Sequence, residues 1–160
     1  MTLRIHQATL ADITFLCDIR LEVLRAVFKL SETQDLSELR KSNEDYYRRA
    51  LLDGSHVACL LYDDDQFVAC GAFCLQEEMP SPDNPNGRCA FIMNIYTRPS
   101  FRGNGAAATV VTWLIDQAKQ REATKIYLET TEEARSLYQS CGFVEMDGYL
   151  VLANEGAKLL

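Results

Sequence analysis

The sequence has no apolar run near the ~20 residues that a membrane-spanning helix requires. Its first six residues also lack the long apolar core of a signal peptide. We therefore expect a cytoplasmic protein with no membrane partner. The chain of 160 residues is 48% hydrophobic and 24% charged, which is ordinary for a globular fold and fits one domain, residues 1–160.

Metal-binding and disulfide motifs are also scarce. The sequence has six cysteines but no CxxC pair, which argues against a zinc site, so no metal is expected. Most of the cysteines lie inside apolar stretches typical of strands or helices, and we expect them to be reduced thiols. The two histidines, His6 and His56, both fall in early predicted strands.

Positive charge is in the minority, and the net charge is −7. This charge disfavours nucleic acid and anionic membrane surfaces as main partners. It is compatible with a cationic substrate, although charge alone identifies none. The nucleotide-binding motifs are missing as well: no GK[ST] follows the glycine-rich turn at residues 102–107, and this turn is not GxGxxG.

What the sequence does contain is a periodicity that predicts an α/β (α+β) fold, a mixed sheet with helices on both faces. The expected order is β-α-α-β-β-β-α-β-α-β-β. Strands are predicted at residues 3–8, 56–62, 67–75, 89–97 and 125–130, and helices at 10–30, 37–52, 105–121 and 132–140. Residues 143–146 and 149–152 are expected to form a terminal hairpin around Asp147-Gly148. Residues 77–88 carry three of the four prolines and predict a long surface loop.

The most informative segment is the turn at residues 102–107, between a buried strand and an amphipathic helix. The first turn of a helix leaves backbone N–H groups without partners, and the helix dipole adds positive charge there. A pyrophosphate can accept several of these bonds. Gly103 and Gly105 would let the backbone approach such a ligand, and Arg102 would add a charged contact. The alternative is an ordinary strand–helix turn that needs glycine for its φ angles.

Three segments carry a resemblance to a known family. Residues 102–107 resemble the R/Q-x-x-G-x-G/A signature of the GCN5-related N-acetyltransferase (GNAT) superfamily, and residues 95–99 resemble the strand that precedes it. Residues 134–143 are similar to the family's A-x-x-L-Y-x-x-x-G-F segment, and residues 3–16 resemble its usual start. The likeness spans nearly the whole chain in the right order, as in a small bacterial-type single-domain member.

The resemblance implies a GNAT fold and an N-acetyltransferase. Such an enzyme moves an acetyl group from acetyl-CoA to a primary amine of a small molecule or peptide, by direct attack in a ternary complex. By the same resemblance, acetyl-CoA is bound by Ile95, Tyr96, Thr97, Arg102, Gly103, Asn104, Gly105, Ala106 and Ala107. A backbone N–H at Ile95 or nearby would polarise the thioester carbonyl. Thr131 stands where many members carry an asparagine that bonds pantetheine.

Tyr138 is the candidate catalytic acid. A phenol with a pKa of about 10 can protonate the departing thiolate, whose basicity is comparable. The alternative is a core aromatic, because Tyr138 shares a helix face with Ala134 and Leu137.

The acceptor side is less defined, and no general base can be named. Asn94, a polar residue inside an apolar strand, either lines the acceptor pocket or satisfies a backbone group at a strand irregularity. Glu129 is a second candidate on the substrate side, with a solvated surface charge as the alternative. A non-catalytic acyl-CoA sensor or partner-binding module, transfer of a longer acyl chain, and a homodimer formed through edge strands all stay open.

Overall fold

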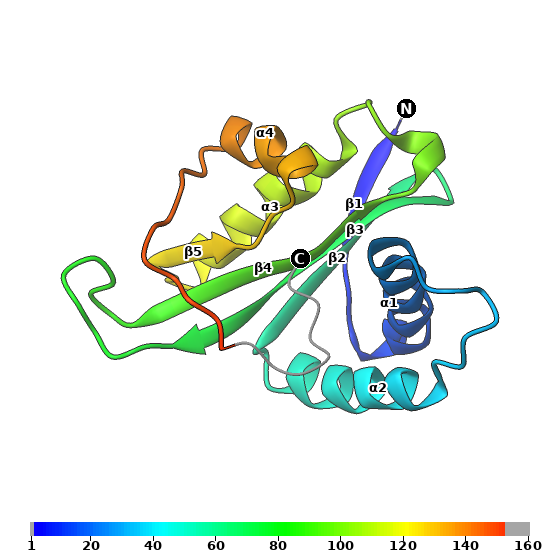
Figure 1. The fold of residues 1–160 in the computed structure, drawn as a ribbon, viewed down its shortest axis with the longest axis horizontal. Coiled ribbons are helices and arrows are strands. Elements are labelled where there is room, and N and C mark those ends of the chain that lie inside the picture. The colour runs from blue at the N-terminus through cyan, green and yellow to red at the C-terminus, as the bar shows by residue number, and fades with distance from the viewer. Residues whose placement is uncertain (1, 153–160) are drawn as a thin grey trace.

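The computed structural model describes residues 2–152, which form a five-stranded mixed sheet (Figure 1). In sheet order the strands are β1 (Leu3–Gln7), β2 (His56–Asp63), β3 (Gln66–Glu77), β4 (Arg88–Thr97) and β5 (Lys125–Leu128). Neighbours from β1 to β4 pair antiparallel, and β4 and β5 pair parallel. Parallel neighbours need a crossover connection, which helix α3 (Ala106–Gln120) provides. The predicted fold class is confirmed.

Helices cover both faces of the sheet. Helices α1 (Ile13–Phe28) and α2 (Ser37–Leu52) lie on one face, and α3 and α4 (Glu132–Ser140) lie on the other (Figure 1). A short 3-10 turn, Leu10–Asp12, precedes α1. Thr9 caps this turn, since its side chain accepts from the backbone N–H of Ala11 and its own N–H donates to Asp12.

The core forms on both faces of the sheet because successive side chains of a central strand point to opposite faces. In β2, Cys59 and Leu61 pack toward α3, whereas Ala58 and Leu60 pack toward α1 and α2. Each of these side chains is at most 3% exposed. A strand buried on both faces reads as a continuous apolar run, which is why this segment is so hydrophobic.

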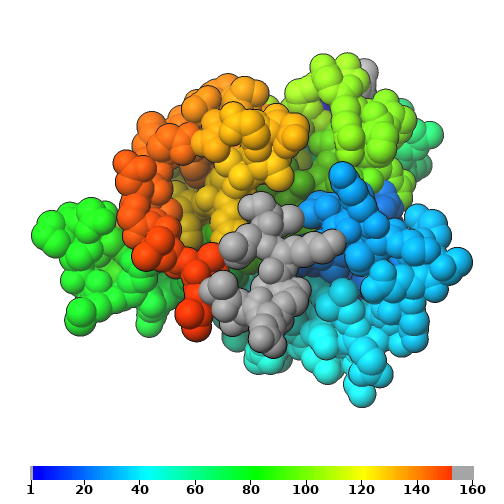
Figure 2. Space-filling view, in the orientation of Figure 1, coloured from blue at the N-terminus to red at the C-terminus, as the bar shows by residue number. Residues whose placement is uncertain are grey.

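The proline-rich loop, residues 78–87, projects from the body of the protein (Figure 2). It is tied down at its base by Asn84, which is 1% exposed and donates to the Cys89 Sγ at 3.2 Å. Asn84 also accepts from the Thr124 hydroxyl. Gly87 has a φ of 72°, and a Cβ there would meet the Glu78 carbonyl oxygen at 2.2 Å. The loop is therefore ordered by polar contacts rather than by apolar packing.

The predicted terminal hairpin is wrong. Gly148 has the left-handed φ of 89° that its turn needs, but residues 143–152 form no strand. Val144, Leu150 and Leu152 are each at least 84% exposed, and a cavity of about 910 Å³ lies between this segment and β5. Two four-residue arms are marginal as an isolated hairpin. Phe143 packs against the core and Tyr149 accepts from Lys125 of β5, but the two arms do not pair with each other.

Two further findings concern the cysteines and the helices. All six cysteines are free thiols, four of them buried and two half-buried. Across residues 2–152, no helix is both long and apolar enough to span a bilayer.

Candidate acyl-donor site

The parallel strands β4 and β5 pair over only part of their length. Their register runs from Cys89 opposite Lys125 to Ile92 opposite Leu128, where β5 ends. Strand β4 continues to Thr97, so within residues 2–152 the stretch from Met93 onward is paired to β3 alone. An extended chain such as pantetheine can bond to a strand edge of this kind. The three predicted donor-binding positions Ile95, Tyr96 and Thr97 all lie on this stretch.

This part of β4 is also less buried than the sequence predicted. The strand was expected to be buried, but only Cys89, Ala90 and Ile92 are, and residues 93–97 are half-buried. The physical reason is the early end of β5, which leaves one edge of β4 uncovered.

The glycine turn follows directly after β4 and a short 3-10 turn, Pro99–Phe101. Gly103 and Gly105 have left-handed φ angles of 80° and 78°. A Cβ on either glycine would meet no atom within 4 Å. The backbone conformation therefore requires glycine here, and crowding by the protein itself does not. The same open space leaves the turn accessible to a ligand.

Helix α3 begins at this turn without a side-chain cap. Gly105 is the N-cap, and the first helical bond runs from the Thr109 N–H to the Gly105 carbonyl at 3.0 Å. The N–H groups before Thr109 thus have no partner within the helix, which makes this end suited to an anion. Arg102 lies beside it, and its Nε donates to the Thr97 carbonyl at 3.1 Å. Asn104 braces the turn through its Nδ2, which is 3.4 Å from the carbonyl oxygens of Phe101 and Arg102.

Thr97, at the end of β4, is a second indication that this site binds a polar ligand. Its Oγ1 is buried and has no hydrogen-bond partner among the described residues. Leaving a buried hydroxyl unsatisfied costs about 1–3 kcal/mol, which a bound polar ligand or water can recover. The residues of the turn and the strand end therefore fit an extended ligand that carries phosphate.

Tyr138, the candidate acid, lies on α4 with 9% of its surface exposed. Its ring packs edge-on against Phe143, with the centroids 6.0 Å apart. Burial raises the pKa of Tyr138, so the phenol keeps its proton at neutral pH. Glu129 and Thr131 line the same cavity of about 910 Å³ as Tyr138. The structure thus brings these three predicted residues together.

Asn94 lies at a strand irregularity, but its side chain bonds to the side chains of Arg20 and Cys70 rather than to a backbone group. The β3–β4 register changes between Cys70 and Ala72, and Asn94 has a left-handed φ of 58°. Its Oδ1 accepts from the Arg20 guanidinium at 2.9 Å. Asparagine tolerates this conformation better than other non-glycine residues, which explains the polar residue in an apolar strand.

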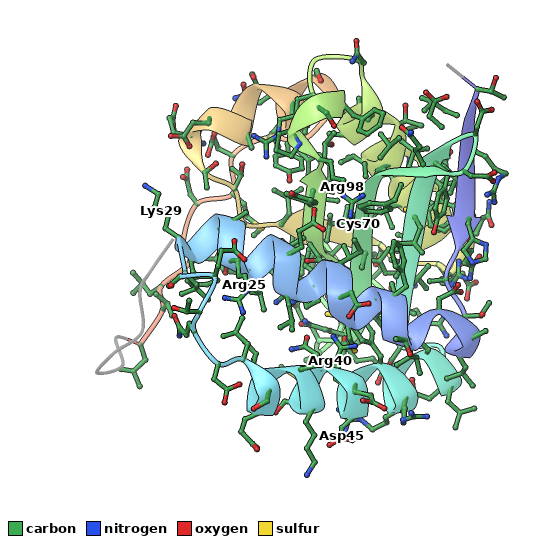
Figure 3. All side chains as sticks on the ribbon, turned by 90° about the vertical axis from the view of Figure 1, so that its right-hand side faces the viewer. Arg25, Lys29, Arg40, Asp45, Cys70 and Arg98 are labelled. Atoms are coloured by element: carbon green, nitrogen blue, oxygen red, sulfur yellow. The ribbon has the colours of Figure 1, made fainter. Side chains whose placement is uncertain are left out.

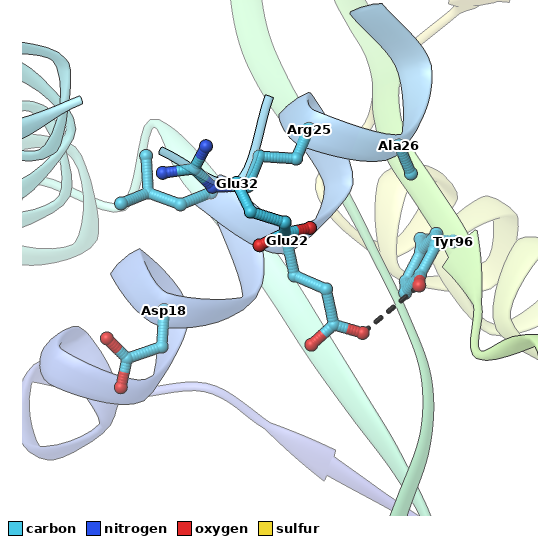
Figure 4. Close-up of a pocket in the computed structure, with 7 residues that line it drawn as sticks. Asp18, Glu22, Arg25, Ala26, Glu32 and Tyr96 are labelled. Carbon is cyan, nitrogen blue, oxygen red and sulfur yellow. Dashed lines mark hydrogen bonds between the residues drawn. The ribbon is translucent and has the colours of Figure 1, made fainter. Parts of the chain in front are cut away.

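The α1 face of β4 holds a network with two residues that the sequence analysis missed, Glu22 and Arg98. Tyr96 and Arg98 both donate to the carboxylate of Glu22 on α1. This network borders a cavity of about 450 Å³. Figure 4 shows this cavity in close-up, with the hydrogen bond between Tyr96 and Glu22 as a dashed line. The cavity is lined by Asp18, Leu21, Glu22, Arg25, Ala26, Glu32 and Tyr96. No local pattern connects α1 to β4, since these partners are more than 70 positions apart.

The remaining chemistry-bearing residues lie elsewhere. His6 bonds to Asp12 at the other end of the sheet, 2.9 Å away. His56 is buried beside Tyr46, and burial lowers its pKa to about 4. Among the described residues, no group of three or more His, Cys, Asp or Glu side chains is placed to hold a metal ion.

The comparison with protein families decides the assignment. The sequence model of the acetyltransferase (GNAT) family matches residues 23–143. The chain belongs to the GNAT acetyltransferase family. A crystal structure of a "predicted acetyltransferase" from Clostridium acetobutylicum with acetyl-CoA superposes with a TM-score of 0.84 at 28% identity, and the match covers 95% of this chain and 96% of that one.

Two curated proteins share part of this GNAT domain. The probable glucosamine 6-phosphate N-acetyltransferase 2 of Oryza sativa subsp. japonica is 34% identical over 100 residues, 60% of this chain and 58% of that protein. The citrate (pro-3S)-lyase ligase of Escherichia coli (strain K12) is 36% identical over 100 residues, 61% of this chain and 24% of that protein. The match thus spans less than two thirds of either relative.

Proposed function

We propose that this GNAT protein transfers an acetyl group from acetyl-CoA to a primary amine of a small molecule or peptide. The observation that carries the proposal is the continuous donor surface from the open edge of β4 to the uncapped N-terminus of α3. The neighbour from Clostridium acetobutylicum, which was solved with acetyl-CoA, supports the identity of the donor.

In this proposal each part of the site has one task. The backbone of Ile95, Tyr96 and Thr97 binds the pantetheine arm along β4. The turn of residues 102–107 binds the pyrophosphate through backbone N–H groups and Arg102. Thr131, at the N-cap of α4, is a further polar contact for the arm.

The reaction forms one C–N bond and breaks one C–S bond. The neutral amine attacks the thioester carbonyl carbon, and the backbone N–H groups near Ile95 stabilise the charge that develops on the oxygen. The Tyr138 hydroxyl gives its proton to the departing sulfur. The proton lost by the amine passes to solvent, and the phenol is then reprotonated. Holding both reactants in line supplies about 7–11 kcal/mol in favourable cases.

The acceptor is proposed to enter from the α1 face, through the cavity of about 450 Å³. Tyr96 lines this cavity and also belongs to the proposed donor strand, so the cavity borders the donor. Three carboxylates and one guanidinium line it, which favours an ammonium group. Asn94, which bonds to Arg20 on α1, is proposed to face the acceptor from this side, and Glu129, which lines the cavity of about 910 Å³ with Tyr138, is proposed to face it from the other side.

The test is release of free CoA from acetyl-CoA with a panel of amines, with the thermal shift produced by CoA as the binding control. Release with at least one amine is expected. A thermal shift by CoA without release from any amine would favour an acyl-CoA sensor. Failure of CoA to shift the melting temperature at high concentration would contradict the donor assignment.

A further inference from the structure

The bulge in β4 lies within the stretch that β5 leaves unpaired. Met93 is opposite Ala72, and Tyr96 is opposite Cys70, so Asn94 and Ile95 share a single opposing residue, Gly71. A bulge of this kind bends the strand and turns backbone groups away from the ladder. Its position on the open edge of β4 places those groups beside the proposed path of the thioester.

Three contacts hold Asn94 from the α1 face. The Nη1 of Arg20 donates to the Asn94 Oδ1 at 2.9 Å. The Cys70 thiol donates to the Asn94 backbone carbonyl at 3.4 Å, and the Asn94 Nδ2 is 3.9 Å from the same sulfur. Figure 3 views the molecule from this side, with Cys70 and the neighbouring Arg98 beyond α1. Burial raises the pKa of the Cys70 thiol, so it keeps the proton that it donates.

The opposite face is fixed by packing. Gly71 leaves a space on the α3 face that the side chain of Ile95 fills. A Cβ on Gly71 would lie 2.5 Å from the Ile95 Cδ1, 2.6 Å from the Val110 Cγ1 and 2.9 Å from the Leu114 Cδ1. Ile95 is thereby held against α3, while Asn94 is held from α1. The two residues of the bulge are fixed from opposite sides of the sheet.

We propose that Arg20 is a positioning residue for acyl transfer, because its bond to Asn94 fixes the bulge that directs backbone N–H groups toward the thioester carbonyl. This inference rests on the proposed function and deepens it by assigning a role to α1. A left-handed backbone is less favourable for asparagine than for glycine, so the contacts of Asn94 add to the stability of the bulge. Donors to a developing oxyanion must lie within a narrow range of distances from it. Arg20 does not touch the thioester; it holds the bulge so that the backbone N–H groups keep this distance.

The experiment replaces Arg20 and measures binding and chemistry separately. Arg20→Met removes the donor and keeps an apolar stem of similar length. We expect kcat to fall about tenfold or more while the KM for acetyl-CoA changes less than about twofold, because small misplacements cost chemistry rather than binding. Arg20→Lys, which can still donate to Asn94, is expected to recover part of the loss.

Arg121→Met is the matched control. Arg121 is also half-buried, it directly follows α3 as the C-cap residue, and it donates to a side-chain amide oxygen, that of Gln117, at 2.8 Å. It lies at the carboxyl end of α3, away from the bulge. The control variant is expected to keep wild-type kcat.

Two spectroscopic measurements separate positioning from a general loss of structure. The carbonyl stretch of bound carbon-13-labelled acetyl-CoA is expected to lie at lower frequency than in water for the wild type, and to return toward the free value in Arg20→Met. Without any ligand, hydrogen exchange of the amides of residues 94–96 is expected to accelerate in Arg20→Met and in Cys70→Ala, and less in Cys70→Ser.

Each of these results tests a separate part of the proposal for Arg20. Unchanged exchange in Arg20→Met would show that Arg20 does not hold the bulge. Faster exchange with unchanged kcat and carbonyl frequency would overturn its role in catalysis. If CoA does not bind the wild type at all, the proposed function and the role of Arg20 in catalysis fail together, and the exchange measurement still decides whether Arg20 fixes the bulge.

Discussion

Arg98, directly after β4, donates two hydrogen bonds to the carboxylate of Glu22 on α1. The Nε to Oε1 distance is 3.1 Å, and the Nη2 to Oε2 distance is 3.0 Å. The Tyr96 hydroxyl donates to the same carboxylate at 3.1 Å. These three bonds join the strand that carries the proposed donor site to the helix that covers the proposed acceptor cavity, so this carboxylate connects the two halves of the site.

The first prediction concerns Glu22→Gln and pH. The hydrogen bonds from Arg98, followed by that from Tyr96, lower the pKa of Glu22. A carboxyl with a lowered pKa stabilises the fold above its unfolded pKa of about 4.3, and this stabilisation is lost as pH falls through the lower folded pKa. Both side chains are more than a third exposed, so we expect a cost of only about 1 kcal/mol at pH 7. Urea unfolding at pH 7 and below pH 4 measures the cost at both ends.

The difference between wild type and Glu22→Gln should shrink at the acid end. Asp116→Asn is the control, since Asp116 is an exposed carboxylate of α3 without an ion pair among the described residues. A difference that stays constant over the whole pH range would show that the charge of Glu22 is irrelevant to stability.

The second prediction is that Tyr138→Phe impairs turnover. Removing the phenol takes away the acid, so kcat should fall about 10²-fold, while acetyl-CoA binding is kept. Steady-state kinetics with free CoA as readout measures both quantities. Tyr62→Phe, at the end of β2 on the far side of the sheet, is the control and should leave both unchanged. Equal kcat in wild type and Tyr138→Phe would refute the acid role and leave a packing role against Phe143.

The third prediction separates the two readings of the glycine turn. Gly103→Ala and Gly54→Ala both place a Cβ in open space at a left-handed φ, of 80° and 76°. Each should therefore cost about 1–2 kcal/mol of stability from backbone strain alone. Only Gly103→Ala should also weaken CoA binding, because Gly54 lies in the turn after α2. Calorimetric titration of CoA measures this, and equal affinity in the two variants would reduce the turn to a structural feature.

The central part of the fold was predictable from sequence, because β2 and α3 carry strong hydrophobic periodicity. The turn at residues 102–107 was predictable for a related reason, since two glycines between a strand and a helix set local geometry. The terminal hairpin was not predictable, because Asp147-Gly148 specifies a turn but not whether its arms pack. The role of Arg20 was not predictable either, since its contact with Asn94 joins positions 74 residues apart.

The fourth prediction tests the proposed acceptor cavity. Glu32 lines it from the α1–α2 connection, and Arg25 holds that connection by donating to the carbonyls of Ser31 and Gln34. Glu32→Gln should raise the KM for a cationic amine about two- to fivefold at low salt, since exposed charges contribute little individually. The effect should fade as ionic strength rises and the Debye length shortens.

A neutral acceptor analogue provides the internal control, because its KM should not respond to Glu32→Gln. Glu38→Gln, in the first turn of α2 and outside the cavity, keeps the net charge change equal. If Glu32→Gln and Glu38→Gln raise the KM by the same factor, the effect comes from the overall charge of −7. The acceptor would then have to enter by another route, and the cavity beside β5 that Glu129 lines becomes the next place to test.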